Sequence, residues 1–209
     1  IRDRNGTLLN DVDLCFSCIN RLLVSHDLKP LDTLSQYREV FTFPIEDYYK
    51  RVGFDFDEIP FSMLAHEYME DYQEKSYACN LHSDVLDVVN KAKNLGFSQT
   101  VLSASKMDYL LKQMETLHVD DLFDSIYGIN DIYAKSKVEL AHAFKQTCSQ
   151  DDEIYFVGDS VHDYEVAKSI GAKCILVTTG HQNRATLESV NVPVMDSLME
   201  SLDLIYERD

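Results

Sequence analysis

The N-terminal stretch Ile1-Arg2-Asp3-Arg4-Asn5-Gly6-Thr7-Leu8 decides how the rest of the chain is interpreted. An acidic residue, one spacer, a short polar residue and then Gly-Thr-Leu is typical of a carboxylate at the end of a buried strand. Gly6 has no Cβ and permits a sharp turn after the strand, and the Thr7 hydroxyl can hydrogen-bond back into that turn. Asp3 would then lie at the strand's carboxyl end, where open α/β sheets bind ligands. Alone, the stretch also fits an ordinary turn, so its meaning depends on the remaining sequence.

Length and charge exclude several classes of partner. The 209 residues suffice for one α/β domain with an insertion or for two small domains. The net charge of −17, from 36 acidic and 19 basic residues, repels phosphate backbones and anionic membranes. We therefore expect neither a nucleic-acid nor a membrane partner, and no apolar run has the length of a membrane span. Only Ile1 and Arg2 precede Asp3, so we expect the native chain to carry further residues before them.

The five cysteines are odd in number and scattered, which predicts a reducing, cytoplasmic location. Cys15 and Cys18 form a Cys-x-x-Cys pair within a helical pattern, and no second pair completes a zinc site. A redox or metal role stays open as the alternative, but we favour two small core-facing side chains.

The first third of the chain has a helical pattern. From Asp11 to about Cys79 apolar residues recur every three or four positions, and no β pattern intervenes. We expect two short helices over residues 33–41 and 44–52, the second with Pro44 at its first position. Longer helices should flank them, so this segment predicts a helical bundle of its own.

From Leu81 onward, strand and helix patterns alternate. Strands are predicted over residues 99–102, 123–127, 153–157 and 174–178, with helices between them, and a short strand and a helix follow Pro193. Continuous apolar strands in such an alternation predict a parallel sheet covered on both faces. The expected fold class is therefore α/β. It comprises a doubly wound, Rossmann-like core (residues 1–11 and 80–209) and a helical-bundle cap (residues 12–79) inserted after the first strand.

Polar residues gather where these strands end. The candidates are Asp3, the Ser103-Ala104-Ser105 stretch, Lys135 and Lys137, and the segment from Gly158 to Asp163. Asp3, Asp159 and Asp163 would form a hard oxygen site suited to Mg²⁺. A hydroxyl with neighbouring backbone N–H groups and a lysine would receive phosphate oxygens.

These four motifs, in this order, resemble those of the haloacid dehalogenase superfamily. They are Asp3-x-x-Gly-Thr-Leu, Leu102-Ser-Ala-Ser105, Lys137 and Val157-Gly-Asp-Ser-x-x-Asp163. The resemblance spans essentially the whole chain and includes the position of the helical cap. It is most specific between Gly158 and Asp163. The Leu8-Leu-Asn-Asp11 and Gly180-His181 stretches are similar to a phosphoglycolate-phosphatase-like branch.

The resemblance implies a Mg²⁺-dependent phosphatase that works through an aspartyl-phosphate. Asp3 would attack phosphorus. Mg²⁺ would be held by Asp3, Asp159, Asp163 and the backbone carbonyl of Asn5. The remaining phosphoryl oxygens would be bound by Ser103, the Ala104 N–H and Lys137. Lys135 is the rival for Lys137, which we prefer because a helix begins at Val138. Arg4 follows the nucleophile directly and is a further candidate for substrate binding.

Asn5 departs from the pattern. Phosphatases of this superfamily usually carry a second Asp two residues after the nucleophile, which protonates the leaving oxygen and then activates water. An amide cannot transfer a proton in this way, and losing general acid–base help typically lowers a rate by about 10²–10⁴-fold. Asn5 nevertheless stays among the catalytic candidates, because it occupies this position.

Three functions remain open. The favoured one is a phosphatase of a small phosphorylated metabolite, phosphoglycolate-like or a sugar phosphate, acting as a monomer or homodimer. The second is a hydrolase or transferase of activated phosphates, whose good leaving groups need little protonation. The third is a catalytically weak protein that binds a phosphorylated ligand. Arg38, Tyr48, Tyr49 and Arg51 fit helix surface and packing as well as substrate contact, and His162 is at most a neighbour of the metal ligands.

Overall fold

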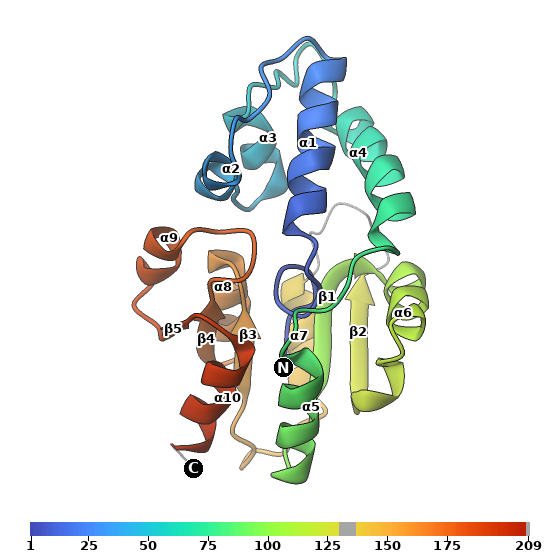
Figure 1. Cartoon of the computed structure of the whole chain (residues 1–209). Coiled ribbons are helices and arrows are strands. Elements are labelled where there is room, and N and C mark those ends of the chain that lie inside the picture. The colour runs from blue at the N-terminus through green and yellow to red at the C-terminus, as the bar shows by residue number, and fades with distance from the viewer. Residues whose placement is uncertain (130–136, 208–209) are drawn as a thin grey trace.

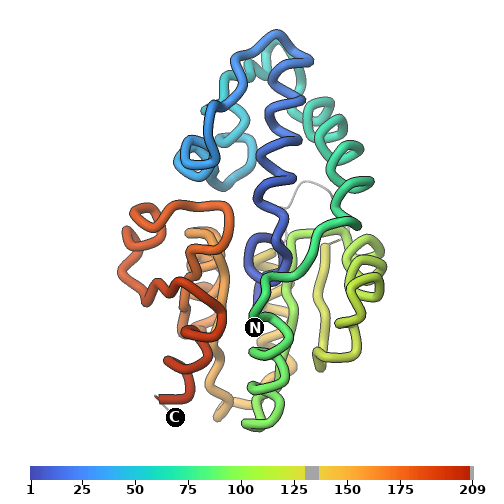
Figure 2. The backbone as a smooth tube through the Cα atoms, viewed as in Figure 1, coloured from blue at the N-terminus to red at the C-terminus, as the bar shows by residue number. Residues whose placement is uncertain are grey.

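The core is a parallel sheet whose strands are joined by helices (Figures 1 and 2). The computed structural model describes residues 1–129 and 137–207. Its strands, in chain order, are β1 (Thr100–Lys106), β2 (Ser125–Ile129), β3 (Tyr155–Gly158), β4 (Lys173–Val177) and β5 (Val194–Met195). The N-terminal residues form the central strand, because Arg2 pairs in parallel with Val101 of β1 and Val157 of β3. The order across the sheet is therefore β2, β1, residues 1–3, β3, β4, β5, with every pairing parallel.

Each face of the sheet carries its own apolar layer. Val157 of β3 and Ile175 of β4 pack with helices α5 (Val85–Asn94), α6 (Met107–Thr116) and α10 (Leu198–Tyr206). The alternate residues Phe156 and Leu176 pack on the opposite face, with α7 (Lys137–Lys145), α8 (Val161–Ser169) and α9 (Arg184–Glu188). Successive strand side chains point to opposite faces of the sheet. Strands with apolar residues at both odd and even positions must therefore be covered on both sides. The predicted doubly wound α/β core is confirmed.

Four helices form a separate bundle beside the carboxyl ends of the strands (Figure 1). They are α1 (Val12–Ser25), α2 (Leu34–Val40), α3 (Ile45–Arg51) and α4 (Phe61–Ser76). The bundle has its own apolar cluster, which draws on all four helices, and Cys15 and Cys18 lie within it as expected. We call residues 12–79 the helical insertion.

The two connections to the insertion lie side by side. Leu9 pairs with Leu81 in an antiparallel bridge, and the Asn10 N–H donates to the Asn80 carbonyl at 2.9 Å. The chain thus leaves the core directly after the Asp3 turn and returns beside it. The insertion must therefore stand over the edge of the sheet at which the strands end.

Several element boundaries differ from the predictions. Strand β1 continues to Lys106, so Ser103, Ala104 and Ser105 lie within it, because β1 still pairs with Ile129 after a register shift. Pro44 is the N-cap of α3 and not its first residue. The pattern did not reveal α9, a five-residue helix that begins where the Asn183 side chain accepts from the Thr186 N–H.

Among the described residues, no helix is both long and apolar enough to cross a bilayer.

A short 3₁₀ helix, Asp120–Leu122, precedes β2, which starts two residues later than predicted.

Candidate active site

Three buried carboxylates meet at the carboxyl end of the central strands. Asp3 follows the N-terminal strand, Asp159 follows β3, and Asp163 lies in the first turn of α8. One oxygen from each of the three lies within 4.8 Å of the others, and all three residues are buried. The sequence therefore predicted correctly which carboxylates would converge.

Local hydrogen bonds fix two of these carboxylates. Asp163 accepts from the N–H groups of Asp159 and Ser160 and from the Ser160 hydroxyl, and the Ser160 side chain caps α8 in return. Asp159 accepts from the Thr7 hydroxyl and from the His181 N–H, both at 2.8 Å.

Two glycines make this packing possible. A Cβ on Gly6, whose φ is +71°, would lie 2.5 Å from Asp159, and one on Gly158 would lie 2.3 Å from Asp163. Both positions therefore need glycine for the close approach of a carboxylate, and position 6 needs it for its backbone conformation as well.

Lys137 links two of the three carboxylates. Its Nζ lies 2.7 Å from Asp3 Oδ1 and 2.5 Å from Asp163 Oδ1, and its side chain is buried. Burial alone would lower the pKa of Lys137, but the charges and hydrogen bonds of Asp163 and Asp3 raise it above the ordinary value. The preference for Lys137 at this position agrees with the geometry, and its rival Lys135 lies outside the described residues.

The cluster is short of positive charge. Three carboxylates against one ammonium leave two negative charges in a buried site. Burial, and then the neighbouring carboxylates against the opposing effect of Lys137, raise the pKa of Asp3 to about 7. Burial and the charge of Asp163 likewise raise the pKa of Asp159 to about 6, although His181 opposes them. A divalent cation bound to these oxygens would supply the missing charge, so the donor set fits Mg²⁺.

The Asn5 amide is held by four hydrogen-bonding groups. Its Nδ2 donates to Asp11 Oδ2 at 2.7 Å and to the Tyr72 hydroxyl at 2.6 Å. Its Oδ1 accepts from Arg4 at 2.9 Å and from the Ser105 hydroxyl at 3.1 Å. All the hydrogen-bonding capacity of the amide is therefore used, and an amide suits this position because it meets a carboxylate on one side and a guanidinium on the other.

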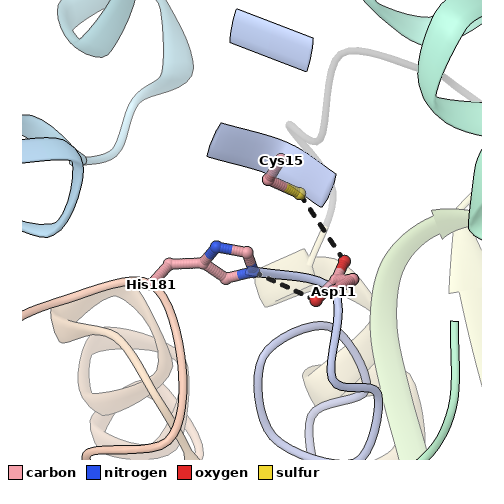
Figure 3. Close-up of side chains that lie close together, drawn as sticks. All are labelled: Asp11, Cys15 and His181. Atoms are coloured by element: carbon pink, nitrogen blue, oxygen red, sulfur yellow. Dashed lines mark hydrogen bonds and ion pairs between the residues drawn. The ribbon is translucent and has the colours of Figure 1, made fainter. Parts of the chain in front are cut away.

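A second polar cluster joins the core to the insertion (Figure 3). His181 Nε2 forms an ion pair with Asp11 Oδ1 at 3.4 Å, and its Nδ1 lies 2.8 Å from the hydroxyl of Tyr37 in α2. Burial by itself lowers the pKa of His181, but the hydrogen bond and charge of Asp11 outweigh it and raise the pKa to about 8. His181 in turn holds the pKa of Asp11 well below its ordinary value against the opposing effect of burial.

This second cluster was not assigned a role from sequence. Cys15 lies beside it, with Sγ 3.7 Å from Asp11 Oδ2. Asp11 already accepts from the Gly6 N–H, the Tyr72 hydroxyl and Asn5. We therefore interpret the cluster as an ion pair at the base of α1 rather than as a metal site.

A cavity of about 180 Å³ lies between the carboxylates and the insertion. Of the predicted site residues, Asp3, Asn5, Ala104, Lys137 and Asp159 line it. Ser160, Ser105, Lys106 and His181 complete its core side, and residues of the insertion form the other side.

Three predicted site residues lie outside the cavity lining. Asp163 is paired with Lys137, and the Ser103 hydroxyl accepts from the Ser105 N–H at 3.1 Å. The Arg4 guanidinium is buried against Asn5, Ser105 and the ring of Tyr109. Arg4 therefore supports the Asn5 amide, and we leave it out of the substrate-binding set proposed below.

Comparisons with known proteins match most of the chain. A family model described as haloacid dehalogenase-like hydrolase matches residues 1–177. A phosphoglycolate phosphatase of Nitrosospira multiformis is 27% identical over 218 residues, covering 98% of this chain and 94% of that protein.

Solved structures share the fold across the whole chain. A predicted phosphatase from Clostridium acetobutylicum superposes with a TM-score of 0.82 at 19% identity, covering 99% of this chain and 96% of that one. A haloacid dehalogenase-like protein from Streptococcus pneumoniae superposes with a TM-score of 0.81 at 18% identity, covering 98% and 96%.

Proposed function

Because this chain belongs to the haloacid dehalogenase-like hydrolase family, we propose that it is a Mg²⁺-dependent phosphatase of a small organic phosphate ester. The observation that carries the proposal is the contact of Asp3 with Lys137 on the wall of a cavity. This contact supports the proposal because Asp3 would act as the nucleophile and Lys137 as the cation for the phosphoryl oxygens. The phosphoglycolate phosphatase named above supports the same reaction class.

In this mechanism Asp3 attacks phosphorus and forms an aspartyl-phosphate. Lys137, which already contacts Asp3, neutralises the charge that grows on the phosphoryl oxygens during transfer. Ala104 on the cavity wall, through its N–H, and the neighbouring Ser103 hydroxyl, which lies just outside the lining, would complete the set of groups for these oxygens.

The metal ligands are the next part of the proposal. Asp3, Asp159, Asp163 and the Asn5 carbonyl would hold Mg²⁺, which supplies charge neutralisation at the phosphoryl group. Asp163 and Asp159 are each fixed by two or more hydrogen bonds, so they would form a prearranged site.

The helical insertion would act as a cap that excludes water from the cavity. The link between Tyr37 and His181 is the contact that such a cap would make and break. We also place the protein in the cytoplasm, on the ground that all five cysteines are free thiols.

A second candidate function follows from Asn5, which holds no transferable proton and is fully hydrogen-bonded. A hydrolase or transferase of activated phosphates would need no acid at this position. A weak enzyme that mainly binds its phosphorylated ligand is the further alternative.

Release of inorganic phosphate from a panel of phosphate esters and acyl phosphates tests the proposal. Turnover should require Mg²⁺ and should be lost in Asp3→Asn, whose amide cannot attack phosphorus. Asp13→Asn, an identical change at an exposed position of α1, is the matched control and should retain activity. Activity that survives EDTA or Asp3→Asn would refute the mechanism.

A further inference from the structure

The insertion side of the cavity is formed almost wholly by apolar and aromatic side chains. They are Cys15, Phe41, Phe43, Ile45, Tyr48, Tyr49, Phe61, Ala65, Tyr68, Met69 and Tyr72. Many of these rings contact one another, and the ring centroids of Phe41 and Tyr48 are 5.1 Å apart. Such a wall favours a flat apolar group and disfavours a charge, because charge removed from water needs a partner.

No described residue of the insertion brings a cation to this wall. The lysines and histidine among the described lining residues all belong to the core. Lys137 is paired with Asp3 and Asp163, and His181 is paired with Asp11. Lys106 is exposed, so its charge lies at the rim of the cavity and not against the wall. Among the described lining residues, a carboxylate on the leaving group would therefore lie against rings and find no buried cation that is not already paired.

The cavity has the size of a single ring. Its volume of about 180 Å³ is close to the roughly 150 Å³ of a protein cavity that takes up benzene.

One polar group in this wall has no partner. Tyr48 is 3% exposed, and its hydroxyl forms no hydrogen bond within the described part of the chain. Buried hydroxyl groups are normally hydrogen-bonded, so the Tyr48 hydroxyl points to a ligand with a polar substituent on its ring.

Asn5 restricts the leaving group independently of the cavity. Without a proton donor at this position, the leaving oxygen must depart as an anion. A phenol has a pKa near 10, whereas an aliphatic alcohol lies close to water at about 15.7. A phenolate is therefore the far better leaving group.

From the cavity wall, the Tyr48 hydroxyl and Asn5, and resting on the proposed function, we infer that the substrate is a phosphate monoester of a phenol whose ring carries a polar group. The ring would occupy the aromatic wall, the ring substituent would bond to Tyr48, and Asp3 would attack phosphorus. The P–O bond to the phenol breaks as the bond to Asp3 forms, and the phenolate leaves with the electron pair. Water then releases phosphate from Asp3.

Four substrates test the contribution of the aromatic ring separately from that of the leaving group. Phenyl phosphate has both features, benzyl phosphate has a ring but an alkoxide leaving group, acetyl phosphate has only a good leaving group, and phosphoglycolate has neither. We expect kcat/KM for phenyl phosphate to exceed that for phosphoglycolate by about 10²-fold or more. Benzyl phosphate should inhibit competitively and turn over slowly, and acetyl phosphate should show a higher KM than phenyl phosphate.

A cation placed in the wall tests the same idea from the protein side. Met69→Lys should lower kcat/KM for phenyl phosphate and raise it for phosphoglycolate. The matched control is Met63→Lys on the same helix, 55% exposed and outside the lining, which should change neither. Tyr48→Phe should abolish any preference for hydroxyphenyl phosphates over phenyl phosphate.

The outcomes distinguish the two levels of the proposal. No turnover of any of the four substrates would refute the phosphatase itself and the inference with it. Turnover led by phosphoglycolate, or benzyl phosphate equal to phenyl phosphate, would overturn only the inference. A hydroxyphenyl preference that survives Tyr48→Phe, or its absence in the native protein, would overturn the role given to Tyr48.

Discussion

Asp159→Asn should stabilise the metal-free protein although it removes a proposed metal ligand. Asp159 is buried, and its pKa is raised from 3.8 to about 6. Keeping it ionised in the folded state above pH 6 therefore costs about 3 kcal/mol, at about 1.4 kcal/mol per pKa unit. The variant removes this cost.

The hydrogen bonds of Asp159 can survive the change. The Asn oxygen can accept from the His181 N–H while its amide donates to the Thr7 hydroxyl, which now accepts. The pKa of about 6 already includes the hydrogen bonds that the carboxylate accepts from His181 and Thr7, so no further loss is subtracted for them. The net expectation is a gain of about 3 kcal/mol at pH 7.5 in EDTA, or about 6–12 °C in Tm for a chain of this size.

The pH dependence has a definite sign. The folded state holds a proton on Asp159 that the unfolded state releases between pH 4 and about 6, so native stability falls as pH rises through that window. The advantage of Asp159→Asn should therefore be absent near pH 4 and complete above pH 6.

Chemical denaturation at pH 4.5 and 7.5, in EDTA and in Mg²⁺, measures all of these effects. Mg²⁺ at 100 times its Kd should add about 2.7 kcal/mol to the native protein and much less to the variant, which removes most of the difference between them. Asp13→Asn should stay within about 0.5 kcal/mol of the native protein throughout. A variant that is less stable than the native protein in EDTA at pH 7.5, or that gains equally from Mg²⁺, would refute the reasoning.

Three further predictions concern other groups. Lys137→Met should lower kcat/KM for phenyl phosphate by about 10²–10³-fold, and a smaller loss would show that the phosphoryl charge is neutralised elsewhere. Because Asp11 raises the pKa of His181 from 6.5 to about 8, the folded state holds a proton that the unfolded state releases. In saturating Mg²⁺ the protein should lose about 2 kcal/mol of stability as pH rises from 6.5 to 8, and His181→Gln should remove that slope. Asn5→Asp should raise turnover of benzyl phosphate by up to about 10²-fold and that of phenyl phosphate far less. Equal effects on both substrates would contradict the claim that Asn5 leaves the site without a proton donor.

Sequence predicted the carboxylate cluster because topology determines it. Asp3 and Asp159 each follow a strand, Asp163 lies in the first turn of the next helix, and parallel strands bring their carboxyl ends to one edge of a sheet. The predicted limits of the strands were less accurate. Strand β1 includes the polar residues from Ser103 onward, which break the apolar pattern, and it pairs with β2 again at Lys106 after a register shift.

The features that sequence did not assign arise from packing between distant segments. The Asp11–His181 ion pair joins the base of α1 to the loop after β4, and neither residue stands in a periodic pattern. Tyr48 and Tyr49 were compatible with either helix packing or substrate contact. Both line the cavity, and only the position of the insertion over the sheet edge shows this.

The central claim is that Asp3 is the nucleophile, and trapping its phosphorylated form tests that claim most directly. Native protein would be mixed with phenyl phosphate and Mg²⁺, quenched in acid within one turnover and reduced with borohydride, which converts an aspartyl-phosphate to homoserine. Mass spectrometry of the peptide that contains position 3 should then find homoserine there, and none when EDTA is present during turnover. Phosphate release without modification of Asp3, or modification of another carboxylate, would contradict the account.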